Sequence, residues 1–354
     1  MAGTIREIAE IAGVSQATVS LVLNDRPGVG REARERILAI ASGMGYVPRK
    51  ALQASRGPSR AIRFLRIAKH GHIVNPSHRV FIADYIDGLE REARQHEYRL
   101  DLQQIHGFDR EKALRSFDAD SVEGVVVLGT ELEEADLEVF VDAPLPVVIL
   151  DTMHPCLDLD FVDMDNASSI NKVVRHFREF GHTRIGLVAS STESENFRQR
   201  SLSFMETMRR SGLDVDPKNC FAIDSTYEKG LADMARLLDG TEELPTALFA
   251  VNDIIAYGCI QALKNKGISV PGDVSVIGFD NLPSDDFMEP RLTSIRVSNG
   301  HMGTRAMRLV LDRIADPSRA KEKVLVGGEL VLRSSVRALG GPSLAGNPAN
   351  RGEE

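Results

Sequence analysis

Residues 4–45 alternate apolar and polar positions with the spacing of three short helices. The apolar positions of the first helix share one face and are expected to be buried: Ile5, Ile8, Ala9, Ile11 and Ala12. Gly13 is suited to end this helix, and Ser15 is suited to cap a second helix that runs to about Asn24. A third helix is predicted from about Arg31 to Met44. Its apolar positions would pack on the first two helices: Ile37, Leu38, Ile40 and Ala41.

The second of these helices has two unlike faces. Its apolar face holds Val19, Val22 and Leu23. The opposite face is more polar and consists of Gln16, Ala17, Ser20, Leu21 and Asn24. A polar-faced helix that follows a tight turn is typical of a helix-turn-helix, whose second helix can enter the major groove of DNA. An ordinary helical hairpin has the same periodicity and is the alternative at this point.

From Ala61 onward the pattern changes to short apolar runs that alternate with helical stretches. The runs predicted as strands are 62–68, 100–105, 122–128, 146–150, 185–188, 222–223, 247–250, 274–278 and 324–326. The stretches predicted as helices include 80–96, 111–117, 167–180, 198–211, 229–239, 254–266 and 300–315. This alternation predicts α/β architecture with doubly wound parallel sheets in two lobes. Ligands of such sheets bind beyond the carboxyl ends of the strands, which here means the cleft between the lobes.

Polar residues directly follow three of the predicted strands. Asp151, Asn252 and Asp280 each come at a strand end, so they are expected to face the cleft. Carboxylates and amides exchange hydrogen bonds with hydroxyl groups, which suits a small polyol. The alternative for each residue is a structural cap or turn. Asp253, for example, could cap the helix that begins at Ile254.

Charge is divided unevenly along the chain. Residues 1–60 contain nine Lys and Arg and five Asp and Glu, a net charge of +4, so the remainder carries −12 of the total of −8. The basic part would neutralise DNA phosphates, and the acidic part would stay off the DNA. A modest basic excess alone is weak support, because many solvated helices have one.

Composition excludes several other classes of protein. No apolar run approaches the ~20 residues of a membrane span, and the polar start lacks an export signal's apolar core, so a cytoplasmic protein is expected. Cys156, Cys220 and Cys259 are far apart without metal-site spacing, which predicts free thiols in a reducing compartment. Three histidines crowd into residues 69–78, but no cysteine or carboxylate cluster accompanies them. We therefore expect no metal and no cofactor.

The sequence GVSQATVSLVLN at residues 13–24 resembles the recognition signature of the lactose/purine repressor (LacI/GalR) family, which carries its helix-turn-helix at the extreme N-terminus. Two core stretches resemble the same family: GHTRIGLV from Gly181, and FAVNDIIAYGCIQALKNKGISVPGDVSVIGFDN from Phe249 to Asn281. The resemblance extends to about residue 337. It implies a DNA-binding head followed by a two-lobed core like that of the periplasmic sugar-binding proteins.

The resemblance also implies domain boundaries. The head would be 1–48 and the hinge helix or linker 49–59. The first lobe would be 60–164 with 292–324, and the second 165–291 with 325–338. The tail, 339–354, is rich in Gly, Pro and Asn and is expected to be disordered. Because the tail lacks the heptads of a tetramerising coiled coil, we expect a homodimer.

The DNA contacts are expected in the head and the hinge, at Thr4, Ser15, Gln16, Ala17, Thr18, Ser20, Leu21, Asn24, Leu52 and Ser55. Gln16 can pair with adenine and Ala17 can touch a thymine methyl, whereas the short hydroxyl and amide side chains suit phosphates. Thr4 and Ser15 could act only as helix caps. Leu21 stands where arginine is common in the family, which predicts reduced readout of guanine. Packing of Leu21 on the third helix is the alternative.

The hinge departs from the family pattern. In relatives a leucine from this segment wedges into the minor groove and kinks the DNA. Ser55 occupies that position here, and Leu52 lies one helical turn earlier. Leu52 could replace the wedge, this hinge could kink DNA less, or the segment could be a flexible basic linker.

For the effector, the resemblance implies contacts from Arg200, Asn252 and Asp280, with Asp151 a weaker candidate. Phe81 falls where relatives read Asn-Pro-Phe-Phe near the ligand. Many relatives stack an aromatic on the ligand at the position of Ser225, and here Tyr227 lies two residues on. The loop of residues 69–78 is unusual, and its basic content would suit an acidic or phosphorylated sugar.

The sequence thus predicts a transcriptional regulator and favours a repressor. Its dimer is expected to bind a pseudo-palindromic operator and to respond to a carbohydrate-like effector. A solute-binding protein without a transcriptional role is one alternative, against which the helix-turn-helix argues. A DNA regulator whose coregulator is a phosphorylated carrier protein is another. An enzyme is disfavoured because no dinucleotide fingerprint, phosphate loop or nucleophile elbow is present.

Overall fold

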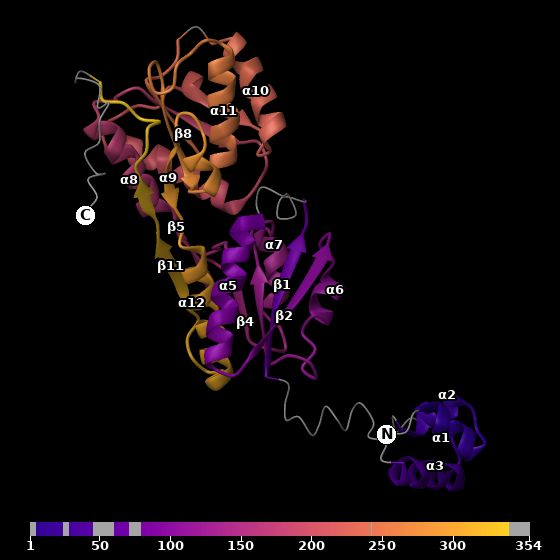
Figure 1. The fold of residues 1–354 in the computed structure, drawn as a ribbon. Coiled ribbons are helices and arrows are strands. Elements are labelled where there is room, and N and C mark those ends of the chain that lie inside the picture. The colour runs from indigo at the N-terminus through magenta and orange to yellow at the C-terminus, as the bar shows by residue number, and fades with distance from the viewer. Residues whose placement is uncertain (1–4, 24–27, 45–59, 71–78, 242, 340–354) are drawn as a thin grey trace, which may run out of the picture. The chain divides into compact units, whose positions relative to one another are not determined.

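The computed structural model describes residues 5–23, 28–44, 60–70, 79–241 and 243–339. It divides into two compact units, residues 1–60 and 61–354, which we call the head and the core. Each unit is described by itself. The core is an α/β structure built around two six-stranded sheets, one in each lobe (Figure 1).

The head contains three helices: α1 (Ile5–Ala12), α2 (Gln16–Leu23) and α3 (Arg31–Gly43). They share one small core, whose buried side chains are Ile8, Ala9, Ala12, Val19, Val22, Ile37 and Ala41. Gly13 adopts a left-handed conformation (φ +63°) between α1 and α2, which is the turn that the sequence predicts. Ser15 then begins α2, because its Oγ accepts the backbone N–H of Thr18 at 3.1 Å.

Two apolar positions of the head are not buried as expected. Ile11 is 62% exposed and Leu38 is 45% exposed. The buried face of α1 is centred between Ile8, Ala9 and Ala12, and a step of 3.6 residues per turn carries Ile11 to the far side of Ile8. The predicted apolar face was therefore too wide by one residue on each of these helices.

The sheet of the first lobe has the strand order β11-β5-β4-β3-β1-β2, and all its neighbouring pairs are parallel. Its strands are β1 (Ala61–Ala68), β2 (Arg99–His106), β3 (Gly124–Leu128), β4 (Val147–Leu150), β5 (Asp160–Asp165) and β11 (Lys323–Gly327). Its helices are α5 (Arg79–Gln95), α6 (Arg110–Arg115), α7 (Glu134–Leu137) and α12 (Asn299–Ala315). Ile62 and Phe64 pack with α5 and α12, whereas Leu65 and Ile67 pack with α6 on the other side.

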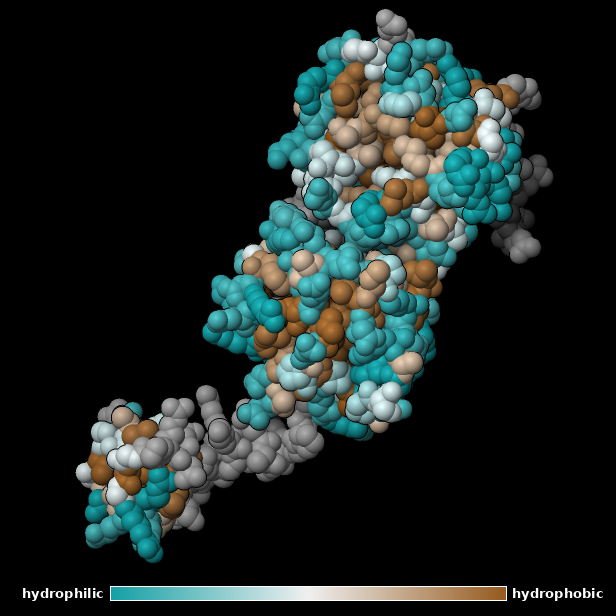
Figure 2. All heavy atoms as spheres, turned by 180° about the vertical axis from the view of Figure 1, so that it is seen from behind, coloured by the Kyte–Doolittle hydropathy of each residue, from teal (hydrophilic) through white to brown (hydrophobic). Residues whose placement is uncertain are grey.

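The sheet of the second lobe has the order β12-β10-β9-β8-β6-β7. Its strands are β6 (Ile185–Ser190), β7 (Cys220–Ile223), β8 (Ala247–Ala250), β9 (Ser275–Asp280), β10 (Thr293–Arg296) and β12 (Glu329–Val331). Only the β10–β12 pair is antiparallel. Its helices are α8 (Asn166–Glu179), α9 (Glu195–Arg210), α10 (Tyr227–Asp239) and α11 (Asp253–Asn265). From behind, polar side chains predominate where the lobes meet, and apolar ones gather on the surface of each lobe (Figure 2).

The chain passes between the lobes three times, close to the predicted places but not at them. The predicted return to the first lobe at residue 292 is too early, because β10 still belongs to the second sheet and the return comes with α12. The predicted final crossing at 325 is also early, because β11 completes the first sheet before β12 joins the second. Three strands, β5, β10 and β12, were not predicted from the apolar pattern.

Helices α5 and α12 lie side by side along the first lobe (Figure 1) because glycines allow their backbones to touch. A Cβ atom on Gly303 would lie 2.4 Å from the carbonyl oxygen of Tyr85 and 3.1 Å from the backbone nitrogen of Leu89. A Cβ on Gly300, in the same helix, would meet only the Asp84 carbonyl oxygen, at an ordinary 3.6 Å.

We expect Gly303→Ala to lower the free energy of unfolding by about 1–3 kcal/mol, because the added methyl group forces the two backbones apart. Gly300→Ala is the matched control and should be neutral or slightly stabilising, since Ala favours helix over Gly by up to ~1 kcal/mol. Thermal unfolding of the full chain measures both. Equal melting temperatures for the two variants would contradict the close packing of α5 on α12.

Candidate functional site

The exposed surface of α2 begins with the residues that the sequence assigns to base contacts. Gln16 and Ala17 are exposed in its first turn, and Ser20 and Leu21 are half-buried. None of these four residues packs on the head's core, and the partly buried side chains that do so include Val14, Leu23 and Ile40. An amide and a methyl group at the start of α2 can therefore reach adenine and thymine edges if this end enters a major groove.

The hydroxyl groups beside them are partly used within the head. The Ser15 Oγ caps α2 and lies 2.8 Å from the Thr18 Oγ1. These two residues thus stabilise the helix start as well as being available to a phosphate. Four other residues expected to contact DNA lie outside the described residues: Thr4, Asn24, Leu52 and Ser55.

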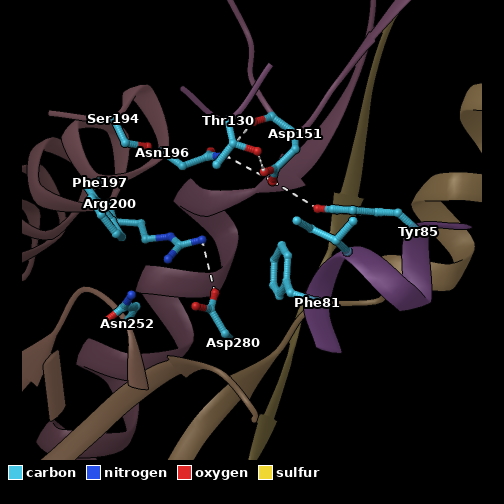
Figure 3. A pocket seen from close by; sticks show the side chains of 11 residues that line it. Phe81, Tyr85, Thr130, Asp151, Ser194, Asn196, Phe197, Arg200, Asn252 and Asp280 are labelled. Atoms are coloured by element: carbon cyan, nitrogen blue, oxygen red, sulfur yellow. Dashed lines mark hydrogen bonds and ion pairs between the residues drawn. The ribbon is translucent and has the colours of Figure 1, made fainter. Parts of the chain in front are cut away.

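A second candidate site lies between the lobes of the core, where strands of both sheets end (Figure 3). Asp151 follows β4, and Asp280 ends β9. Both have left-handed backbones, with φ of +68° and +111°, which turns the chain sharply at the strand end. We call the cavity at this place the inner chamber; Phe81, Tyr85, Asp151, Arg200, Asn252 and Asp280 are among its lining residues. Its free volume is only about 40 Å³.

The Asp151 carboxylate is held from several elements. The Tyr85 hydroxyl on α5 donates to its Oδ1 at 2.9 Å, and the Thr130 hydroxyl beyond β3 donates to its Oδ2. The Asn196 Nδ2 on α9 donates to the backbone oxygen of Asp151 at 3.0 Å. Because α9 belongs to the second lobe and Asp151 to the first, this bond joins the lobes directly.

Arg200, also on α9, is buried and oriented by three kinds of contact. Its Nε donates to the Asn166 Oδ1 at 3.1 Å and its Nη1 to the Val251 carbonyl oxygen at 2.7 Å. Its Nη2 lies 3.3 Å from the Asp280 Oδ1, and the guanidinium lies 3.8 Å from the centre of the Phe279 ring. Figure 3 shows Arg200 and Asp280 directed at each other across the chamber. Such a fixed fork can present its remaining N–H to a ligand oxygen.

Three buried carboxyl groups surround this single guanidinium. Burial raises the pKa of Asp151 to about 6 and that of Asp280 to about 7, although Arg200 opposes both increases. Burial also raises the pKa of Asp163, on β5, well above its ordinary value. More carboxyl groups therefore gather around Arg200 than one cation can balance, and burial favours their protonated forms.

Asn252 caps a helix through its side-chain oxygen, and its side-chain nitrogen is not used in that role. It is the N-cap of α11, where its Oδ1 accepts the backbone N–H of Ile255 at 2.8 Å. Its buried Nδ2 has no hydrogen-bond partner among the described residues. Asp253 is not the cap that the sequence offered as an alternative. It is fully buried and accepts hydrogen bonds from the Leu282 backbone N–H and the Ser294 hydroxyl.

The structure brings together five of the six residues assigned to the effector by sequence: Phe81, Asp151, Arg200, Asn252 and Asp280. Tyr227 is different, since it starts α10, is 37% exposed and is not part of this lining. The sequence analysis missed Tyr85, Thr130 and Asn196. Tyr85 lies one helical turn after Phe81 and Thr130 lies just beyond β3, so helix spacing and the strand-end rule could have found these two.

Other kinds of site receive no support in the described parts of the chain. No three histidine, cysteine or carboxylate side chains converge there in a way that could hold a metal ion. His72 and His78 of the histidine-rich loop lie outside the described residues. No described helix is both long and apolar enough to cross a membrane.

Comparison with known proteins shows which family contains both a head and a core of this kind. Residues 4–49 match the family described as bacterial regulatory proteins, lacI family, and residues 174–336 match a periplasmic binding protein-like domain. The chain is 32% identical over 342 residues to the HTH-type transcriptional repressor CytR of Escherichia coli K12, a match that covers 96% of this chain and 97% of that protein. This chain belongs to the LacI family. The repressor PurR of Mannheimia succiniciproducens is 30% identical over 95% of this chain and 99% of that protein.

Two solved structures of regulatory proteins have the same fold. The lac repressor dimer bound to operator and the anti-inducer ONPF matches with a TM-score of 0.71 and 22% identity, over 96% of this chain and 100% of that chain. The transcriptional regulator CelR in complex with cellobiose matches with a TM-score of 0.69 and 24% identity, over 94% of this chain and 99% of that chain. These structures confirm the predicted fold. The family models and the two repressors above confirm that the chain is a DNA-binding transcriptional regulator with a helix-turn-helix head.

The raised carboxyl pKa values predict a pH-dependent stability. The folded protein holds protons on Asp151 and Asp280 up to about pH 6 and 7, whereas an unfolded Asp releases its proton near its ordinary pKa of 3.8. Between these values the folded state binds more protons, so rising pH lowers the free energy of unfolding through these two groups. Asp280→Asn removes one charge and leaves Asp151 and Asp163 to balance Arg200.

We expect the melting temperature of Asp280→Asn, relative to wild type, to rise by a few degrees between pH 5.5 and pH 8, because each unit of pKa shift corresponds to ~1.4 kcal/mol. Asp142→Asn, at an exposed aspartate, is the control and should show a pH-independent difference. A difference for Asp280→Asn that is constant with pH, or that falls as pH rises, would contradict the raised pKa of this carboxyl.

Proposed function

We propose that this LacI-family regulator is a cytoplasmic repressor that binds a pseudo-palindromic operator as a homodimer, with one head on each half-site. The exposed start of α2 supports this proposal, because Gln16 and Ala17 stand where a recognition helix meets base edges. The excess of positive charge in residues 1–60 favours the phosphate backbone, and the acidic core favours solvent.

We further propose that a small hydroxylated effector binds between the lobes without being turned over and changes the affinity of the heads for DNA. The observation that carries this is the convergence of polar groups from both lobes on one cavity. Asp151 and Thr130 come from the first lobe, and Asn196, Arg200 and Asp280 come from the second. A ligand that contacts both lobes stabilises one lobe arrangement over the other by its difference in affinity for the two.

The proposed function is tested by binding of the full chain to DNA of its own promoter region at two salt concentrations, with and without a panel of carbohydrates. Tight, salt-sensitive and sequence-selective binding that one compound alters is the expected result. Gln16→Ala tests whether the start of α2 reads the base sequence. It should weaken binding to the operator by ~1–3 kcal/mol, while its binding to unrelated DNA and its salt dependence stay unchanged. The absence of selective DNA binding would contradict the assignment.

The inter-lobe bond from Asn196 gives a prediction for the effector response. Asn196→Ala removes the donor to the Asp151 backbone oxygen, so the arrangement of the lobes in this structure loses ~1–3 kcal/mol of hydrogen bonding. We expect the effector concentration for half-maximal response to change about tenfold. The reference is Asn171→Ala, at an exposed asparagine on α8. If both variants respond to effector like wild type, the cleft does not control DNA binding through this contact.

A further inference from the structure

A larger cavity adjoins the inner chamber and is not explained by the effector contacts described so far. We call it the outer chamber. Its volume is about 580 Å³, against about 40 Å³ for the inner chamber. The two share Thr130, Ser194 and Phe197 in their walls, so they are contiguous. The inner chamber alone is too small for a sugar ring, because its volume is that of one or two water molecules. Most of any ligand that reaches it must therefore occupy the outer chamber.

The walls of the outer chamber carry a strong excess of negative charge. Five carboxylates line it, three beyond β3 and two beyond β6: Glu131, Glu133, Glu134, Glu193 and Glu195. The one arginine in the wall, Arg198, is held by a two-pronged ion pair with Glu195 at 2.6 and 2.8 Å. Lys69 belongs to the loop whose basic content suggested an acidic effector, but it forms ion pairs with Glu133 and Asp136.

A buried histidine in the same wall has one nitrogen without a partner. His154 is 7% exposed and lines the outer chamber, with its Nδ1 3.8 Å from the Glu134 Oε2. Among the described residues, nothing forms a hydrogen bond with its Nε2. When the Nδ1 carries its proton toward Glu134, the Nε2 is an acceptor, which a ligand N–H would satisfy. Unpaired buried polar atoms are uncommon in proteins, so this nitrogen is an independent indication of a ligand.

We propose that the two chambers together bind a single hydroxylated compound that carries a protonated amine. Its hydroxyl groups reach Asp151, Arg200, Asn252 and Asp280 in the inner chamber. Its ammonium group lies in the outer chamber among the glutamates and the His154 Nε2. The inference rests on the proposed effector function of the cleft and specifies the class of effector. It replaces the acidic or phosphorylated sugar suggested by the basic loop, because a ligand anion would face the excess of negative charge in the wall of the outer chamber.

The test uses three open-chain probes that share one polyol and differ at one end. Glucamine carries an ammonium group there, sorbitol a neutral hydroxyl and gluconate a carboxylate. Calorimetric titration of the full chain with each probe should give glucamine an affinity about tenfold above that of sorbitol, with gluconate the weakest, as expected for ligand charges close to several carboxylates. Added salt should narrow the difference between glucamine and gluconate.

Variants separate the outer chamber from general attraction to an acidic protein. Glu134→Gln together with Glu193→Gln should remove most of the preference for glucamine and leave sorbitol binding unchanged. Glu228→Gln, at an exposed glutamate on α10 outside both chambers, is the control and should keep the preference. His154→Phe should weaken glucamine more than sorbitol. A loss of preference in the Glu228 variant equal to that in the double variant would overturn the proposal.

The proposal is also overturned if gluconate binds as tightly as glucamine or if none of the three probes binds. These failures are distinguishable from failure of the proposed function. If the protein binds its promoter selectively and a neutral or anionic compound releases it, the regulator stands and the assignment of a cationic effector is wrong. If selective DNA binding is absent, the regulatory function itself fails, whatever the probes do.

Discussion

The buried charge of Arg200 is the constraint around which the cleft is organised. A guanidinium that is 3% exposed must be paired and hydrogen-bonded, because an isolated buried charge is very costly. Here Asn166, the Val251 carbonyl oxygen and Asp280 supply that environment, and the Phe279 ring covers one face. These partners come from α8, from the residue after β8 and from β9, so the position of one side chain depends on three elements of the second lobe. Through Asn196, four residues away on α9, the same helix also holds the first lobe.

Strained backbone at the strand ends is maintained by a second set of contacts. Asp280 and Asn281 both have positive φ, which non-glycine residues rarely adopt. The Ser294 hydroxyl accepts the Asn281 backbone N–H at 3.1 Å, and Arg333 donates to the Asn281 side chain at 2.9 Å. Asp253, which receives the Leu282 N–H and the Ser294 hydroxyl, completes this support. The direction in which Asp280 points is therefore decided by residues with no place in the chamber wall.

The sequence predicted most of the architecture because apolar periodicity is local. It failed where burial depends on distant partners. Strand β5 reads DFVDMD, and its buried Asp160 is tolerated because distant residues pair with it. Arg313 donates to both carboxylate oxygens at 3.0 and 3.1 Å, and the Glu322 backbone N–H donates to one of them at 2.7 Å. The rule that ligand-binding residues follow strand ends did place Asp151, Asn252 and Asp280 beside the cleft. It could not find Asn196, whose importance depends on the approach of one lobe to the other, nor the glutamates of the outer chamber, which look like ordinary solvated residues along the chain.

The order of strands in the first sheet has a consequence for synthesis. Its edge strand β11 and its covering helix α12 come from residues 299–327, whereas the strands they complete come from 61–165. The Glu92–Arg308 ion pair joins α5 to α12 across 216 positions of sequence. A ribosome therefore releases β6 to β10 of the second lobe, residues 185–296, before the first lobe can close its core. The first sheet then has five of its six strands, and the face that α12 covers stays exposed during that interval, which makes it a site for chaperone binding and aggregation.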